Sequence, residues 1–220
     1  MTRLVVFDLD GTLIDSRRDL TDATNAMLVE HGAAPLQEDE VARMVGEGAA
    51  VLVRRALAAA GLPPEMPGAL ERFLEHYDAR LTVHTRPYDG VPETLSALRA
   101  RDLRLAVLTN KPGRAATAIL DALELSPWLS RVVGGDTPAG RKPDPAGLLG
   151  VIASEGASPA STWLVGDSPV DLETARRAGT GICLARYGFG FLFDDAAFRG
   201  DEWIIDDPRD LIALVDAPPA

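Results

Sequence analysis

Two carboxylates stand two residues apart near the start of the chain, in the segment VVFDLDGTL, residues 5–13. The apolar run before Asp8 has the length of a strand, and Asp8 and Asp10 fall where alternate side chains point the same way. Loops after the carboxyl ends of parallel strands line the ligand crevice, so both side chains are expected to face it. Their mutual repulsion predicts a divalent cation nearby, and Gly11 allows the backbone to approach an anion closely.

Two further segments carry polar groups suited to phosphate. RLAVLTN ends in Thr109 and Asn110, which can donate hydrogen bonds to phosphate oxygens without adding charge, although both types are also common in ordinary loops and helix caps. GGDTPAGRKPDP contains Lys142, which could offset the charge of a nucleophilic carboxylate and hold a phosphoryl group. Lys111 and Arg141 are rival candidates for that cation.

A fourth segment, TWLVGDSPVDLETARRAG, places Asp167, Ser168 and Asp171 between an apolar run and a helical pattern. Aspartate at such a position is often only a helix cap. The joint arrangement favours a site, because all four polar segments follow or adjoin the ends of expected strands. We therefore expect carboxylates, a hydroxyl and a lysine to meet at one edge of a sheet.

The elements that must position these groups follow a regular alternation. The pattern predicts an α/β fold, a Rossmann-like parallel sheet with helices on both faces, because the strands are almost continuously apolar. The expected strands cover residues 4–7, 105–108, 132–133, 163–165, 181–184 and 203–205, and the expected helices cover 91–101, 114–123, 145–155 and 170–178.

The interval between the first strand and residue 86 breaks this alternation. It contains helical stretches at 19–30, 38–44, 49–60 and 67–81 and no convincing strand. We therefore expect an inserted, all-helical domain over residues 15–85, and a sheet domain built from residues 1–14 and 86–220; the family likeness described next makes these the cap and the catalytic core.

The order DLDGTL, LTN, KPDP and GDSPVD resembles the four motifs of the haloacid dehalogenase (HAD) superfamily, and the helical insertion resembles that superfamily's cap. The likeness implies that Asp8 attacks phosphorus and forms an aspartyl-phosphate, which water then hydrolyses. It implies that Asp10 protonates the leaving alkoxide and later deprotonates the attacking water. The dehalogenases of the superfamily lack the DxD pair, so phosphoryl chemistry is favoured over carbon–halogen cleavage.

The resemblance also implies a set of ligands. Mg²⁺ would be held by Asp8, the backbone carbonyl of Asp10 and Asp167, with Asp171 acting from outside this set or through water. The phosphoryl oxygens would be bound by Thr109, Asn110, Lys142 and the amides around Asp10 and Gly11.

The narrower likeness is to bacterial phosphoglycolate phosphatases, through RMVGEGAAVLVRRAL, TRPYDGV, GGDTPAGRKPDPAGLL and EWIIDDP. The loop Gly46, Glu47, Gly48 is expected to approach a small substrate when the cap closes. Glu47 would repel a glycolate carboxylate, so it must point elsewhere, bind through water or a cation, or indicate another substrate. The possible carboxylate partners are Arg17, Arg43, Arg54 and Arg55.

Composition restricts the partners. The 220 residues carry a formal net charge of −11, which argues against nucleic-acid binding, so the expected partner is a small phosphorylated metabolite. No targeting segment and no apolar run of roughly 18 residues is apparent, so we expect a cytoplasmic protein with no membrane partner, as a monomer or homodimer. The one cysteine, Cys183, allows no internal disulfide and is expected in the core.

Other activities stay open from the sequence. A phosphomutase, or a pyrophosphate or nucleotide phosphatase of the same superfamily, would share the phospho-aspartate chemistry. A receiver-like signalling or binding module also gathers aspartates, a hydroxyl and a lysine around a phosphorylated aspartate. Its phosphorylated residue typically follows a middle strand, whereas the DxDGT motif here opens the chain.

Overall fold

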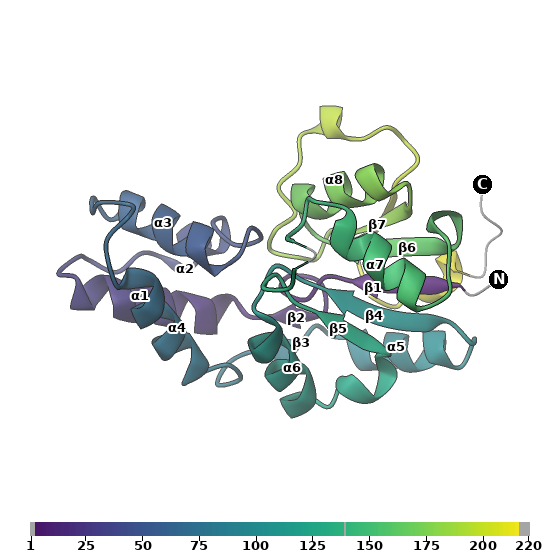
Figure 1. The fold of residues 1–220 in the computed structure, drawn as a ribbon, viewed down its shortest axis with the longest axis horizontal. Coiled ribbons are helices and arrows are strands. Elements are labelled where there is room, and N and C mark those ends of the chain that lie inside the picture. The colour runs from purple at the N-terminus through teal and green to yellow at the C-terminus, as the bar shows by residue number, and fades with distance from the viewer. Residues whose placement is uncertain (1–2, 139, 216–220) are drawn as a thin grey trace.

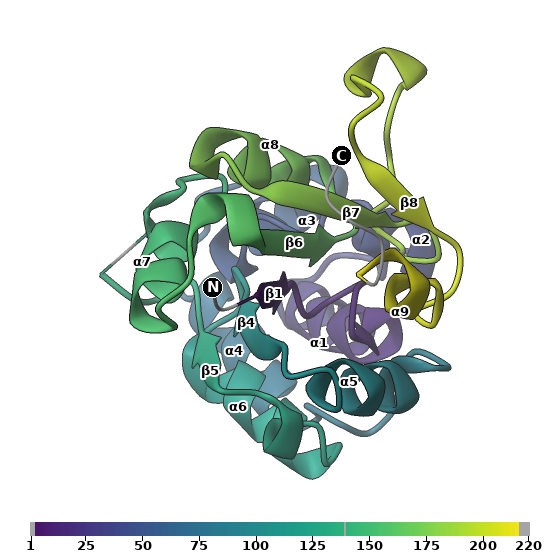
Figure 2. The same ribbon diagram turned by 90° about the vertical axis from the view of Figure 1, so that its right-hand side faces the viewer.

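A computed structural model describes residues 3–138 and 140–215 of the chain. Its main sheet has six parallel strands in the order β5-β4-β1-β6-β7-β8, so the first strand lies in the middle (Figures 1 and 2). The strands are β1 (Leu4–Phe7), β4 (Arg104–Leu108), β5 (Arg131–Val133), β6 (Thr162–Gly166), β7 (Gly181–Ala185) and β8 (Trp203–Ile205). All six expected strands are present, and the α/β class is confirmed.

Strand β1 is buried on both sides because its side chains alternate between two cores. Val5 and Phe7 belong to one hydrophobic cluster, and Leu4 and Val6 belong to the other. None of the four is more than 3 % exposed. This explains why the strand reads as a continuous apolar run.

Helices cover both faces of the sheet, as Figure 2 shows. The first face is covered by α5 (Val91–Arg99), α6 (Gly113–Ala122) and the short α9 (Asp210–Leu214). Of these three helices, α9 was not predicted from the sequence. The opposite face is covered by α7 (Ala146–Ser154) and α8 (Pro169–Ala178). Single 3-10 turns lie at Ser126–Trp128, Pro159–Ser161 and Asp195–Ala197.

A separate helical layer stands beyond the carboxyl ends of the strands, at the left of Figure 1. It contains α1 (Arg17–Glu30), α2 (Glu38–Ala42), α3 (Ala49–Ala59) and α4 (Ala69–Asp78), and α1 packs along α4. The expected helix 67–81 is shorter in the structure, because Gly68 adopts a left-handed conformation, with φ of 80°, and α4 begins after it. These helices form the cap.

Two short strands join the cap to the sheet. β2 (Ile14–Asp15) pairs antiparallel with β3 (Arg86–Pro87), so the outgoing and returning chain lie side by side. The expected division into residues 15–85 and residues 1–14 with 86–220 stays a prediction, and its outer limits lie outside the described ranges. No helix within residues 3–138 and 140–215 has both the length and the apolar character to cross a membrane.

Candidate active site

Asp8 lies directly after β1, where the central position of that strand holds its backbone. The Asp8 amide donates to the carbonyl of Val165 at 2.8 Å, which continues the pairing with β6. Its side chain is buried, and Oδ1 lies 2.8 Å from the Lys142 ammonium nitrogen. Burial raises the pKa of Asp8 to about 6, and the charge of Lys142 opposes that rise.

Lys142 is shared between two carboxylates. Its ammonium also lies 2.6 Å from Asp171 Oδ1, and the other Asp171 oxygen accepts hydrogen bonds from the backbone and hydroxyl of Ser168. Burial alone would lower the pKa of Lys142, but the charges of Asp171 and Asp8 outweigh burial and raise it. The structure therefore brings together Asp8, Lys142 and Asp171, and it sets Lys142 rather than Lys111 or Arg141 against Asp8.

The side chain of Asn110 has three backbone partners. Its amide nitrogen donates to the carbonyl oxygens of Gly46 and Lys142, at 2.9 and 3.0 Å, and its oxygen accepts from the Lys142 amide at 2.8 Å. Both amide hydrogens are thus engaged with backbone carbonyls, and phosphate binding by Asn110 stays a prediction. These contacts fix the backbone of Lys142 and link the core to the cap. The Thr109 hydroxyl, buried at the end of β4, lines the cavity beside it.

Asp167 follows β6 and is enclosed by glycine backbone. Its Oδ2 accepts a hydrogen bond of 2.7 Å from the amide of Gly190. A Cβ atom on Gly11 would lie 1.9 Å from the same oxygen, and one on Gly188 would lie 2.4 Å from Asp167 Cβ. Only glycine fits these positions, so the backbone at Gly188 and Gly190, in the segment YGFGFLF, residues 187–193, lies directly against Asp167.

The buried acidic groups fit a divalent cation. Asp8, Asp167 and Asp171 each offer a carboxylate oxygen, and these oxygens lie within 4.8 Å of one another. Burial, then the charges of Asp171 and Asp8, raise the pKa of Asp167 well above its usual range. Three buried carboxylates around a single ammonium leave a local excess of negative charge, and hard oxygen donors of this kind suit Mg²⁺. Asp171 is already engaged with Lys142 and Ser168, so Asp8 and Asp167 have the freer oxygens.

Asp10 points away from this cluster, toward the cap. One of its oxygens accepts a 2.6 Å hydrogen bond from the Ser16 hydroxyl, and the other lies 2.8 Å from the Lys111 ammonium. Lys111 also donates to the Tyr77 hydroxyl, at 2.8 Å, from the core to cap helix α4. Asp8 and Asp10 belong to the same motif, yet each pairs with a different lysine: Asp8 with Lys142 and Asp10 with Lys111.

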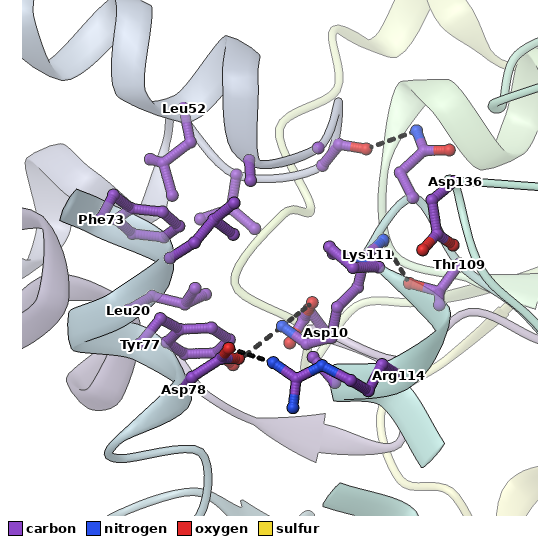
Figure 3. A pocket seen from close by; sticks show the side chains of 18 of the residues that line it. Asp10, Leu20, Leu52, Phe73, Tyr77, Asp78, Thr109, Lys111, Arg114 and Asp136 are labelled. Atoms are coloured by element: carbon purple, nitrogen blue, oxygen red, sulfur yellow. Dashed lines mark hydrogen bonds and ion pairs between the residues drawn. The ribbon is translucent and has the colours of Figure 1, made fainter. Parts of the chain in front are cut away.

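A cavity of about 340 Å³ lies between the core and the cap (Figure 3). Its floor is formed by the carboxylates of Asp8 and Asp10 and by the residues that directly follow β4. Its cap wall is mainly apolar and comprises Leu20, Val45, Leu52, Phe73, Leu74 and Tyr77. The site thus opens into a partly open cavity of a size typical for small ligands.

The expected cap loop is divided by the structure. Gly46 and Gly48 line the cavity, whereas Glu47 forms an ion pair with Arg55 away from it. This pairing removes the expected conflict between Glu47 and an anionic substrate. The four expected carboxylate partners, Arg17, Arg43, Arg54 and Arg55, are not among the described residues that line the cavity. Arg17 instead pairs with Asp15.

The comparisons with known proteins agree with this geometry. The family model of haloacid dehalogenase-like hydrolases matches residues 5–185. The chain belongs to this family. A protein of Rhodospirillum rubrum named phosphoglycolate phosphatase is 44% identical over 93% of this chain and 91% of its own length. A protein of Pseudomonas aeruginosa named N-acetylmuramic acid 6-phosphate phosphatase is 36% identical over 97% of this chain and 95% of its own.

A solved structure also matches. The crystal structure of a predicted phosphoglycolate phosphatase from Haemophilus somnus 129PT aligns with a TM-score of 0.90 at 32% identity, covering 97% of this chain and 98% of that chain. The haloacid dehalogenase-like fold with a helical cap, expected from the order of the four motifs, is confirmed.

Several residues of this hydrolase site were not predicted. Ser16, Gly188 and Gly190 touch expected site residues, Tyr77 touches Lys111, and Lys111 was considered only as a rival to Lys142. Ser16 and Tyr77 lie in segments read only as helical cap. The two glycines could have been noticed, because glycine at alternate positions in an aromatic run marks a close backbone approach.

A second acidic group lies in the cap of this hydrolase. Asp19, Asp22 and His84 offer ligand atoms within 4.8 Å of one another. Asp22 lies 3.2 Å from the Arg80 guanidinium, and Asp19 accepts from the backbone and hydroxyl of Thr85. These contacts give the group a structural role at the return from the cap.

Proposed function

We propose that this chain is a magnesium-dependent phosphatase that hydrolyses 2-phosphoglycolate to glycolate and inorganic phosphate through an aspartyl-phosphate on Asp8. The observation that carries the proposal is the 2.8 Å contact between the buried Asp8 carboxylate and Lys142, beside Asp167. A carboxylate needs no proton removal before it attacks, but it must approach an anion, and a cation at this distance reduces the repulsion. The relatives named phosphoglycolate phosphatase support the substrate.

In the first step an oxygen of Asp8 attacks phosphorus while the bond from phosphorus to the leaving oxygen breaks. Asp10 carries a proton into this step and transfers it to the leaving alkoxide, with its carboxyl group oriented by the Ser16 hydroxyl. Lys142 and the Thr109 hydroxyl hold the phosphoryl oxygens. A magnesium ion held by Asp8, Asp167 and the Asp10 carbonyl would stabilise the negative charge on the phosphoryl group.

In the second step water attacks the phosphorus of the aspartyl-phosphate. Asp10, now ionised, accepts a proton from that water, the bond to Asp8 breaks, and both aspartates return to their starting forms. The apolar cap wall limits the access of other water molecules to the intermediate. Each half of the cycle therefore uses Asp10 in the opposite direction.

A second candidate is a larger sugar phosphate. The cavity of about 340 Å³, with its apolar cap wall, has room for a leaving group larger than glycolate. The relative named N-acetylmuramic acid 6-phosphate phosphatase is a precedent at 36% identity. This candidate keeps the same chemistry at Asp8 and changes only the group that the cap encloses.

The deciding experiment measures phosphate release from a panel, with magnesium and with EDTA. We expect 2-phosphoglycolate to give the highest kcat/KM and EDTA to abolish turnover. A higher kcat/KM for N-acetylmuramic acid 6-phosphate, pyrophosphate or a nucleotide would show that 2-phosphoglycolate is not the substrate. Isomerisation of glucose 1-phosphate would indicate a phosphomutase, and a stable phosphoprotein without turnover would indicate a signalling module.

The proposal also includes a cytoplasmic location and a monomeric or homodimeric state. The location is supported by Cys183, which is buried and forms no disulfide. Gel filtration with light scattering measures the oligomeric state directly.

A further inference from the structure

We propose that Lys111 and Tyr77 form a subsite for a carboxylate of the substrate, next to the leaving oxygen. This inference rests on the proposed function and narrows it to phosphate esters of short hydroxy acids, in which the carboxylate lies close to the ester oxygen. It assigns to Lys111 the binding of the substrate carboxylate, for which the sequence analysis considered four arginines.

Lys111 is a cation placed inside the cavity rather than at its rim. Its side chain is 4% exposed, and its ammonium lies 2.8 Å from Asp10 Oδ2 and 2.8 Å from the Tyr77 hydroxyl (Figure 3). The ammonium also lies 4.6 Å from the centre of the Tyr77 ring. Phe73, on the same cap helix, stacks on the Tyr77 ring with the two ring centres 5.8 Å apart.

The position matches the geometry of a phosphorylated hydroxy acid. Asp10 is the residue that we assign to the leaving oxygen, so that oxygen must come within hydrogen-bond distance of its carboxyl group. In 2-phosphoglycolate the carboxylate is joined to the leaving oxygen by one methylene. A group that touches Asp10 on its cavity side, as Lys111 does, is therefore within reach of that carboxylate.

Tyr77 supplies a second polar contact. Its hydroxyl oxygen accepts the hydrogen bond from Lys111, so its own hydrogen is available to donate to an oxygen in the cavity. An ammonium and a hydroxyl side by side can bind the two oxygens of one carboxylate. The subsite thus joins one residue of the core to one residue of the cap.

The charge of the cavity makes such a cation necessary for this substrate. The described lining residues include four carboxylates, those of Asp8, Asp10, Asp78 and Asp136. A substrate with both a phosphate and a carboxylate brings a second anionic end into these surroundings. Lys142 serves the phosphoryl end, so the carboxylate end needs its own partner.

Only one other cation is among the described lining residues. Arg114 is 72% exposed in its side chain and pairs with Asp78 at the rim. Its charge is exposed to solvent and already paired, so it contributes little to a buried anion. Lys111 is the cation that burial makes effective, because a charge interaction is stronger away from water.

A different role for Lys111 would be to orient Asp10 or to hold the cap closed. Either role would affect all phosphate esters alike, whereas a carboxylate subsite affects only the esters that carry a carboxylate. The ratio of kcat/KM for a charged and a matched neutral substrate separates these roles.

The experiment compares 2-phosphoglycolate with 2-hydroxyethyl phosphate, in which a CH₂OH group replaces the carboxylate. We expect the wild-type enzyme to prefer the acid by at least about tenfold and Lys111→Met to lower that preference by roughly ten- to a hundredfold. Much of the change for the acid should appear in KM. Tyr77→Phe should lower the preference a few-fold, in the same direction, and it carries the test if Lys111→Met does not fold.

The control is Arg114→Gln, which removes a positive charge from the rim of the same cavity and should leave the preference within about twofold. An unchanged preference in Lys111→Met and Tyr77→Phe overturns the subsite, even if 2-phosphoglycolate is the substrate. A wild-type enzyme that hydrolyses both esters equally also overturns it. Failure of the wild-type enzyme on every phosphate ester would instead overturn the proposed function.

Discussion

The ammonium nitrogen of Lys142 lies 2.8 Å from Oδ1 of Asp8, and both side chains are buried at the carboxyl edge of the sheet. Residues 134 positions apart in the chain thus form an ion pair out of contact with bulk water. The pair has two consequences. First, the ammonium favours the ionised form of the nucleophile, although burial opposes ionisation. Second, loss of either partner would leave a buried charge unpaired and so destabilise the fold.

Replacement of Asp8 by Asn should abolish catalysis while the fold remains. The amide keeps the shape of the side chain but cannot attack phosphorus, so phosphate release should fall by about a thousandfold or more. Circular dichroism and the thermal midpoint check the fold. Turnover near the wild-type rate in Asp8→Asn would refute the aspartyl-phosphate. A matched control is Asp22→Asn in the cap, which changes the charge equally, away from the cavity.

Replacement of Lys142 by Met should destabilise the protein. The change leaves the buried carboxylates of Asp8 and Asp171 without their shared cation, and loss of one partner of a buried pair costs about 3–5 kcal/mol. Urea unfolding without metal at pH 7 measures this loss. The loss should be smaller at pH 5, because the unpaired carboxylates can then take up protons. An equal loss at both pH values would contradict this explanation, and Lys142→Arg tests whether charge alone suffices.

Stabilisation by magnesium should increase with pH. Without metal, burial raises the pKa of Asp8 to about 6, above its unfolded value near 3.8, so the folded state binds the extra proton. Stability from this group is therefore present below pH 3.8 and is lost as pH rises toward 6. Bound magnesium favours the ionised form and reverses that loss.

The corresponding measurement is the thermal midpoint in EDTA and in magnesium at pH 5, 6 and 7. The difference between the two midpoints should be small at pH 5 and largest at pH 7. Comparison at each pH cancels the contribution of surface groups that do not bind metal. A metal effect of the same size at all three values would argue against a site built on Asp8 and Asp167.

A methyl group at Gly188 should weaken the metal site. Its Cβ would lie 2.3 Å from the Gly11 carbonyl oxygen and 2.4 Å from Asp167 Cβ, so Asp167 must move. We expect Gly188→Ala to raise the magnesium concentration for half-maximal activity by about tenfold or more. Gly150→Ala is the control, since nothing lies within 4 Å of a Cβ there and alanine favours a helix by roughly 1 kcal/mol. Equal responses of the two variants would exclude the steric explanation.

The sequence predicted what local patterns encode. The apolar run before Asp8 marked a strand of a sheet covered on both faces, and the polar residues after it marked its carboxyl end. Because parallel strands end at one edge, the order of strands and helices predicted that carboxylates and a lysine meet there, and the structure brings together Asp8, Lys142 and Asp167. The choice of Lys142 over Lys111 and Arg141 came from the likeness to the family.

Contacts between distant segments were beyond those patterns. The ribbon of β2 and β3 is two residues long on each side, too short for any periodicity, and joins segments about 70 positions apart. The backbone contacts of Asn110 were not predicted, because an amide can bind phosphate or backbone equally well. Lys111 and Tyr77 meet only because the cap folds back over β4, and neither residue has a local pattern that indicates the other.

The central place of β1 determines the order in which heat should damage this enzyme. A strand hydrogen-bonded on both edges opens only when the whole sheet opens, so its amides should be among the slowest to exchange with deuterium. The loop of Gly188 and Gly190, which closes over Asp167, has no such protection on either side. Inactivation should therefore precede melting, with the nucleophile still in place and its surroundings already loosened.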